Sequence, residues 1–141
     1  MNAPCPLCHP DHETVLWQNR SARVVLVDDA AYPGFCRVIW QAHVAEMTDL
    51  VPAERRHLME LVFGVETALR QALNPAKINL ASLGNQVPHI HWHVIARHAD
   101  DATFPDAIWA APRRIGAARS VDVAALRQAL HTALPAALGT I

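Results

Sequence analysis

The stretch HIHWHVI, residues 89–95, places a histidine at every second position, three times in succession. Residues two apart on a β-strand point to the same face of the sheet, whereas a helix would scatter them around its axis. On a strand the three imidazoles therefore share one face, and Ile90, Trp92 and Val94 share the other. We predict a strand over residues 89–96, with its apolar face covered by a helix and its histidine face open to a ligand.

Four further segments have the composition of strands. They are rich in β-branched residues or alternate polar with apolar positions, and turn-forming residues separate them. These segments are residues 14–17, 23–27, 36–40 and 77–82. The first two form a predicted hairpin, and the last forms a second hairpin with the histidine-bearing strand.

Two helices are expected as well. Apolar residues recur at steps of three and four over residues 52–73, and Asn74-Pro75 stops the pattern. A second helix is predicted to begin with Ser120 as its N-cap and to end at Pro135. Strands, helix, strands and helix in this order indicate an α+β fold with an antiparallel sheet.

Length and charge exclude several functions. A chain of 141 residues fits a single domain over residues 1–141. With 12 Lys+Arg against 13 Asp+Glu, the net charge of −1 argues against nucleic acid as a partner. No apolar run approaches the roughly 18 residues of a membrane span, and residues 1–12 lack a signal-peptide pattern. We expect a soluble, cytoplasmic protein without a membrane partner.

The histidine alternation suggests chemistry at phosphorus. Same-face residues of a strand are about 6.5–7 Å apart, so one phosphate cannot contact three rings equally. A neutral imidazole can attack phosphorus and form a phosphoramidate that water later breaks. The middle ring, His91, is the predicted nucleophile, with one ring nitrogen held by an acceptor and with His89 and His93 as its neighbours. The competing interpretation is a catalytic zinc ion held by these histidines.

A second motif lies near the N-terminus, where Cys5 and Cys8 form a C-x-x-C pair. This spacing suits a structural zinc ion that takes two further nitrogen or sulfur ligands, and His9 is one spare candidate. The alternative is a pair of reduced surface thiols. The third cysteine, Cys36, is expected to be a small buried apolar residue.

Other polar and aromatic residues are given structural roles. The histidines at positions 9, 12, 57, 98 and 131 and the arginines at 113, 114 and 119 are expected to be ordinary core or surface residues. Trp17, Trp40 and Trp109 have the rings to stack on a base, but large aromatic residues more often form core or interface.

The heptapeptide resembles the H-φ-H-φ-H-φ-φ signature of the histidine triad (HIT) superfamily of nucleotidyl hydrolases and transferases, where φ is apolar. Residues 84–87, GNQV, and residues 38–43, VIWQAH, are similar to two further HIT segments. The resemblance covers residues 5–97, whereas residues 98–141 lie outside it. Relatives often have Gly-His where this chain has Gly34-Phe35, and a proline in place of Trp40.

The resemblance implies a fold and a reaction. The fold is a five-stranded antiparallel sheet with one long helix and a C-terminal helix, in a homodimer whose sheets join into ten strands. In the reaction His91 attacks the α-phosphate of a purine nucleotide, and water hydrolyses the resulting nucleotidyl-histidine. His93 contacts the phosphate, and His89 orients the site.

The resemblance also implies the substrate contacts and a metal site. Substrate-binding residues are Asn85 and Gln86 in the loop, Asn79 on the preceding strand, and Asp28 at the ribose hydroxyls. Catalysis requires no cofactor, and a structural zinc ion matches Cys5, Cys8, His43 and His89. Two alternatives to the hydrolase stay open: a nucleotide-binding dimer with negligible turnover, and a zinc-dependent hydrolase. The leaving group, of the phosphoramidate or dinucleoside polyphosphate type, is left undecided by the sequence.

Overall fold

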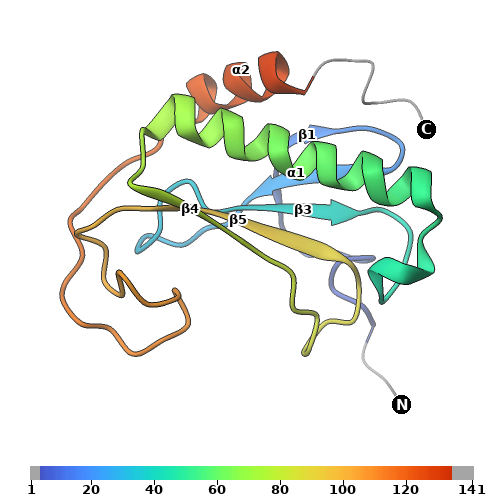
Figure 1. The fold of residues 1–141 in the computed structure, drawn as a ribbon, viewed down its shortest axis with the longest axis horizontal. Coiled ribbons are helices and arrows are strands. Elements are labelled where there is room, and N and C mark those ends of the chain that lie inside the picture. The colour runs from blue at the N-terminus through green and yellow to red at the C-terminus, as the bar shows by residue number, and fades with distance from the viewer. Residues whose placement is uncertain (1–3, 135–141) are drawn as a thin grey trace.

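Five strands form one open antiparallel sheet in the computed structural model, which describes residues 4–134. The strands are β1 (Thr14–Gln18), β2 (Ala22–Leu26), β3 (Cys36–Trp40), β4 (Lys77–Ala81) and β5 (His91–Arg97), and their order across the sheet is β1-β2-β3-β5-β4. The expected α+β fold and five-stranded antiparallel sheet are confirmed. Both helices lie on one side of the sheet (Figure 1).

Three helical segments lie within the described residues, and the long one begins and ends where the sequence signals it. They are the short 3-10 turn η1 (Met47–Asp49), the long helix α1 (Pro52–Leu73) and the C-terminal helix α2 (Val123–Ala133). A proline at the first position of α1 costs nothing, because the N–H it lacks would have no partner there. Asn74 ends α1 in the left-handed conformation, with φ 46°, directly before Pro75. In residues 4–134, no helix combines the length and the apolar character needed to cross a membrane.

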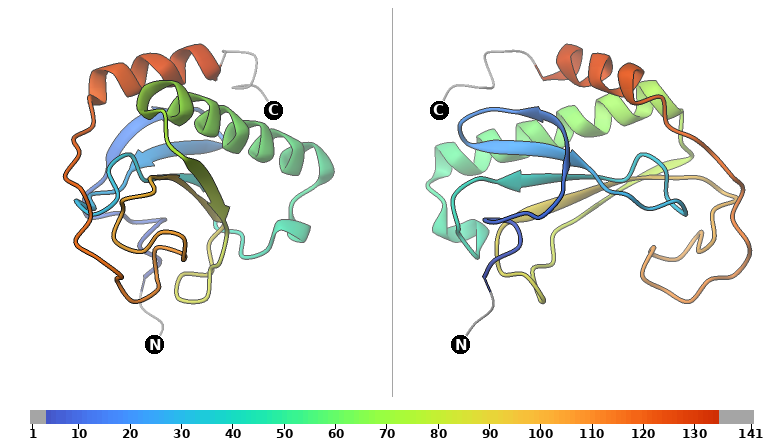
Figure 2. Two further views of the ribbon diagram at one scale, coloured as in Figure 1. Left: turned by 60° about the vertical axis from the view of Figure 1, so that its left-hand side comes forward. Right: turned by 180° about the vertical axis from the view of Figure 1, so that it is seen from behind.

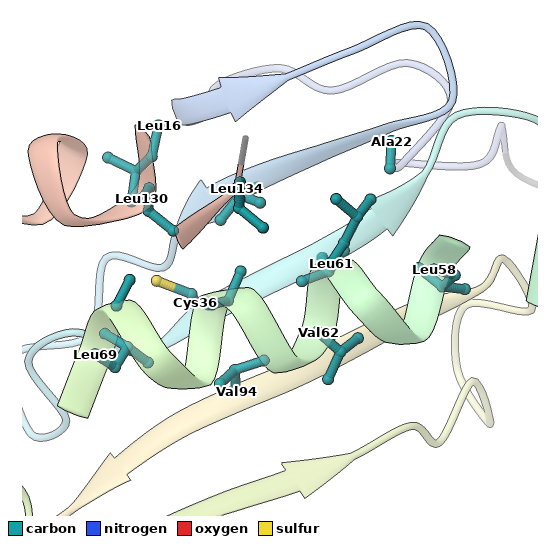
Figure 3. Close-up of a cluster of buried hydrophobic side chains, with 14 of the residues drawn as sticks. Leu16, Ala22, Cys36, Leu58, Leu61, Val62, Leu69, Val94, Leu130 and Leu134 are labelled. Carbon is teal, nitrogen blue, oxygen red and sulfur yellow. The ribbon is translucent and has the colours of Figure 1, made fainter. Parts of the chain in front are cut away.

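The core lies between the sheet and the helices (Figure 3). The face of α1 that carries Leu61, Val62 and Leu69 packs on the strands, where Cys36 of β3 and Val94 of β5 are fully buried. Burial raises the pKa of the Cys36 thiol to about 12, as expected of a cysteine that serves as an apolar residue. The helix-covered face of the sheet is therefore a closed layer, and a site must use the other face.

The histidine-bearing strand begins two residues later than predicted. β5 starts at His91, because the backbone of the two preceding residues makes turn and loop bonds instead of ladder bonds with β4. The N–H of His89 donates to the carbonyl of Val87, and the N–H of Ile90 donates to that of Val44, each at 2.8 Å. The prediction of a strand from residue 89 is therefore wrong at its start, with consequences for the first histidine.

The N-cap of α2 also differs from the prediction. Asp122, not Ser120, accepts the hydrogen bond of the first turn, from the N–H of Ala125 at 3.0 Å. Both residue types are good caps, so the sequence offered two candidates two positions apart. The predicted helix end at Pro135 lies outside the described residues.

Two irregular segments cover part of the open face of the sheet (Figures 1 and 2). One is the N-terminal segment before β1, and the other is the long loop between β5 and α2. The fully buried Arg97 anchors this loop through a two-bond ion pair with Asp101, at 2.8 and 3.0 Å. Tyr32, Phe35 and Ile95 form a small second core beneath the loop. The cleft between the two segments is the candidate site.

Candidate active site

A cleft of about 880 Å³ opens on the face of the sheet away from the helices. Its floor is formed by side chains of β2, β3 and β5, and its walls by the N-terminal segment, the loop after β2, the loop over residues 83–87 and the long loop after β5. The volume lies in the range of small-molecule sites, which hold ligands of nucleotide size. His91 and His93 both line the cleft.

His91 is held in one tautomer by the main chain. Its Nδ1 lies 2.7 Å from the carbonyl oxygen of His89. A carbonyl oxygen only accepts, so the proton is on Nδ1 and the lone pair is on Nε2. A half-buried imidazole with a free Nε2 beside a cleft is an oriented nucleophile.

His93 is the buried neighbour of this ring. The His91 and His93 ring centroids are 5.0 Å apart and the rings are nearly perpendicular, at 89°. Burial, assisted by the electrostatic influence of the neighbouring His91 and Arg37, lowers the pKa of His93 to about 4. His93 is therefore a neutral imidazole near neutral pH, and its Nδ1 has no hydrogen-bond partner within residues 4–134.

His89 takes a different place from the other two histidines. Its backbone precedes β5, and its imidazole is fully buried away from the cleft, with Nε2 donating to the carbonyl of Trp40 at 2.5 Å. Nδ1 points to a cluster of sulfur and nitrogen ligands instead. The expectation that three imidazoles share one open face therefore holds for His91 and His93 only. His89 reaches His91 through its main-chain carbonyl.

The cluster has the donor set of a metal site. The Sγ atoms of Cys5 and Cys8 and the Nδ1 atoms of His43 and His89 all lie within 4.8 Å of one another. Four sulfur–nitrogen and nitrogen–nitrogen separations are 3.4, 3.3, 3.5 and 3.2 Å. Zinc bonds of about 2.0–2.3 Å at tetrahedral angles require edges of about 3.3–3.8 Å. Among residues 4–134 this is the one group of three or more such side chains that meets this criterion.

The surroundings of the cluster also suit zinc. The Nε2–H of His89 is held by a backbone carbonyl, an outer-shell bond that fixes the orientation of a ligand histidine. Burial also lowers the pKa of His89, which favours the neutral ring that a metal requires. For Cys5, burial raises the thiol pKa, but hydrogen bonds from the backbone of Cys8 and Leu7 and from the Cys8 side chain, with the charge of Arg23, outweigh this effect and lower it. The pKa of Cys8 is raised, by burial and by the neighbouring Cys5. The two thiols are half-buried beside histidines, so the cluster fits a structural zinc ion.

Three of the four expected substrate contacts line the cleft. Asn85 and Gln86 lie on the loop over residues 83–87, and Asp28 lies on the loop after β2. Asn79 does not line it, because its side-chain oxygen accepts a hydrogen bond from the Arg97 guanidinium at 2.7 Å. Asn79 thus belongs to the polar network that anchors the loop after β5.

Two further residues line the cleft: Arg37, which sequence reasoning did not single out, and Trp109, which it placed in the core or an interface. Arg37 of β3 pairs with His93 of β5 and points to the same open face, between buried Cys36 and Val38. Trp109, on the loop after β5, is 54% exposed, and its ring centroid lies 5.3 Å from that of His93 in an edge-to-face contact. The alternation of residues 36–40 could have placed Arg37 opposite the core, but its pairing with His93 required the strand order. Nothing local in the sequence distinguishes Trp109 from the buried Trp40.

Comparisons with known proteins agree with this geometry. The sequence profile of the HIT domain matches residues 11–100. A histidine triad protein of Bradyrhizobium japonicum is 28% identical, with a TM-score of 0.71 over 84% of this chain and 90% of that chain. A HIT protein of Sinorhizobium meliloti is 25% identical, with a TM-score of 0.70 over 86% and 90%.

A more distant structure shows the same fold. A hypothetical histidine triad nucleotide-binding protein of Sulfolobus tokodaii is 14% identical, with a TM-score of 0.61 over 92% of this chain and 89% of that chain. A search of the curated proteins found no match. The profile match spans well over half of the chain and includes the heptapeptide and the cleft residues of β2, β3 and β5. This chain belongs to the HIT family.

Proposed function

We propose that this protein is a nucleotidyl hydrolase or transferase that cleaves a bond at the 5′-phosphorus of a purine nucleotide. The observation that carries the proposal is the 2.7 Å hydrogen bond from Nδ1 of His91 to the carbonyl of His89. It leaves the lone pair on Nε2 of a ring that lines a cleft of nucleotide size. The nucleotide-binding name of the Sulfolobus protein supports the substrate class.

The reaction follows from this arrangement in two steps. In the first, Nε2 of His91 attacks the α-phosphorus, a P–N bond forms, and the bond to the leaving group breaks with its electron pair on the leaving group. In the second, water attacks phosphorus, the P–N bond breaks, and a nucleoside monophosphate is released, with the proton of water passing to solvent. Neutral His93, beside His91, donates an N–H to a phosphoryl oxygen. Asp28 accepts from the ribose hydroxyls.

The metal cluster has a separate task in this proposal. Cys5, Cys8, His43 and His89 would hold a zinc ion with four protein ligands, which leaves no open position for a substrate. Such an ion supplies structural stability to the N-terminal segment. Because the cluster excludes His91 and His93, the geometry favours the histidine nucleophile over a zinc-dependent hydrolase. We further propose that the chain works as a cytoplasmic homodimer.

The first test measures release of AMP from adenosine 5′-phosphoramidate and from diadenosine tetraphosphate. The wild type should turn over at least one of them, and a rapid acid quench should trap a nucleotidyl group on the peptide that contains His91. His91→Ala should lose both signals, whereas His131→Ala, an exposed histidine on α2, should retain both. A wild type that binds AMP but shows neither turnover nor adduct would contradict the proposal and indicate a nucleotide-binding module.

A further inference from the structure

Two buried polar atoms on the floor of the cleft have no hydrogen-bond partner among residues 4–134, and they belong to neighbouring residues. They are Nε of Arg37 and Nδ1 of His93, and these two residues are directly paired across β3 and β5. The other buried side-chain atom in this state within the same range, Nε1 of Trp92, is on a side chain packed against the main core. Buried polar groups are almost always hydrogen-bonded, so two such atoms on paired residues indicate that one bridge satisfies both.

The two side chains converge beside the ring of Phe35. The guanidinium carbon of Arg37 lies 5.6 Å from the centroid of this ring, and the His93 ring centroid lies 5.5 Å from it. Directly paired residues have Cβ atoms about 4.5–5.5 Å apart. Two hydrogen bonds through one water molecule span about 5.5 Å, so this spacing suits a water bridge between the two nitrogen atoms.

The other groups around this pair are already bound or have no polar atom to offer. Phe35 has no polar side-chain atom, and Nδ1 of His91 is bound to the main chain. Burial lowers the pKa of the Arg37 guanidinium, and the charge of Glu13 opposes this effect. The Glu13 carboxylate nevertheless accepts from Arg23, at 2.7 and 2.9 Å, and makes no hydrogen bond with Arg37.

Arg37 therefore decides which ring nitrogen of His93 carries the proton. A guanidinium can only donate, so a water that accepts from Nε of Arg37 has its own hydrogens left to donate. A lone pair on Nδ1 of His93 accepts one of them, whereas a proton there would face a donor and a positive charge. The proton of the neutral ring is then on Nε2, which is not one of the buried unpartnered atoms and belongs to a cleft-lining side chain.

We propose that Arg37 is a positioning residue that acts through one bound water to keep the ring proton of His93 on Nε2, facing the phosphoryl group. This inference rests on the proposed function and deepens it, because donation from His93 to a phosphoryl oxygen requires this tautomer. The two cleft histidines then have opposite tautomers. His91 presents a lone pair to phosphorus, and His93 presents an N–H to the oxygen beside it.

The first measurement reads the tautomers directly. NMR of the full chain with isotope-labelled histidine rings shows which nitrogen of each ring carries a proton, and His93→Gln identifies the signals of position 93. The wild type should have the proton on Nε2 of His93 and on Nδ1 of His91. In Arg37→Met, which keeps the length of the side chain without its donors, His93 should populate both tautomers, and its pKa should rise above about 4.

Matched variants separate the donor from the charge. Arg37→Gln, which keeps an N–H donor without the charge, should restore part of the Nε2 tautomer. Arg119→Met removes a cation of the same cleft that Asp100 already holds, at 2.7 and 3.2 Å, and should leave the His93 signals unchanged. Melting curves establish that each variant is folded.

Kinetics separate this inference from the proposed function. On a substrate that the wild type turns over, Arg37→Met should lower kcat about 10-fold with a smaller change in KM, since outright loss of such a donor costs about 10²–10³. If the wild type neither turns over nor forms an adduct, the proposed function fails, while the NMR spectra still test Arg37. A proton on Nδ1 of His93 in the wild type, or a tautomer or kcat unchanged in Arg37→Met, would overturn the inference.

Discussion

The two ends of the HIHWHVI segment contrast in backbone, partners and solvent access. At residue 89 the chain is a turn, and the imidazole is buried among two thiols and a second histidine. At residues 91 and 93 the chain is a strand, and the imidazoles line a cleft. One hydrogen bond, from Nδ1 of His91 to the carbonyl of His89, joins the two sites. The difference teaches that a strand boundary can divide one motif between a structural and a chemical role.

The strongest test of this division places the same substitution, histidine to asparagine, first at position 91 and then at position 89. His91→Asn should lower turnover about 10⁴-fold or more, because an amide cannot replace the nucleophile, while metal content stays unchanged. His89→Asn should instead lose bound zinc and lower the melting temperature, with turnover reduced much less, since the carbonyl that holds His91 belongs to the main chain. Steady-state kinetics and metal analysis on both variants give the answer. If His91→Asn and His89→Asn lost turnover equally, His89 would belong to the catalytic site and the proposed division would be wrong.

Removal of the thiols tests the structural side alone. Cys5→Ser combined with Cys8→Ser should reduce zinc from about one ion per chain to none and lower the free energy of unfolding by about 4 kcal/mol, the stabilisation expected of an ion present at about 1,000 times its Kd. Cys36→Ala, at the cysteine outside the cluster, serves as the control and should keep the zinc. Chelation that stopped catalysis in a protein that stays folded would contradict this assignment and favour a zinc-dependent hydrolase.

The chemical side is sensitive to pH through His93. Its pKa is lowered from 6.5 to about 4. Between these pH values, the imidazole is mostly protonated in the unfolded chain and mostly neutral in the folded chain. The stability due to the neutral ring is complete above pH 6.5 and declines as pH falls toward 4, by about 3 kcal/mol in total.

The free energy of unfolding, measured with denaturant at several pH values from about 4 to 6.5, checks the expected loss of stability in acid. His93→Gln serves as the comparison. The glutamine variant should have a flatter dependence of stability on pH, because its amide does not titrate. Identical slopes for the two proteins would assign the acid sensitivity to other groups.

The smallest effect is expected at the rim of the cleft. Trp109→Ala removes a ring of the cleft lining that can stack on a nucleotide base; such stacking is worth about 1 kcal/mol, so KM should rise about fivefold with a smaller change in kcat. Ile115→Ala, at a 99% exposed position of the same loop, is the matched control. A wild-type KM in Trp109→Ala would remove this residue from the site.

Much of the fold was accessible from the sequence because local signals agree with it. The alternation at residues 91–95 and the apolar face of α1 predicted the layers. The position of His89 was not accessible, because it depends on the bond from the Ile90 N–H to Val44 and on the bond from His89 Nε2 to Trp40, both to residues distant in the chain.

The site was predictable only where the motif itself supplies the residue. His91 and His93 are found from their spacing, whereas the place of Arg37 in the cleft follows from its pairing with β5, which no local pattern reveals. Asn79 was expected to bind substrate, but its side-chain oxygen accepts a hydrogen bond from the buried Arg97 instead. Both cases depend on long-range contacts between strands.

The two edges of the sheet differ in a way that limits assembly. Arg127 of α2 donates to the carbonyls of Val15 and Leu16 on β1, and the register of β1 shifts within Val15–Trp17. Such features block an edge from accepting another strand. On β4, pairing within residues 4–134 involves β5 alone. In the homodimer proposed above, pairing through this one edge would join two copies around a two-fold axis and leave no edge for further growth, which favours closed pairs over fibres.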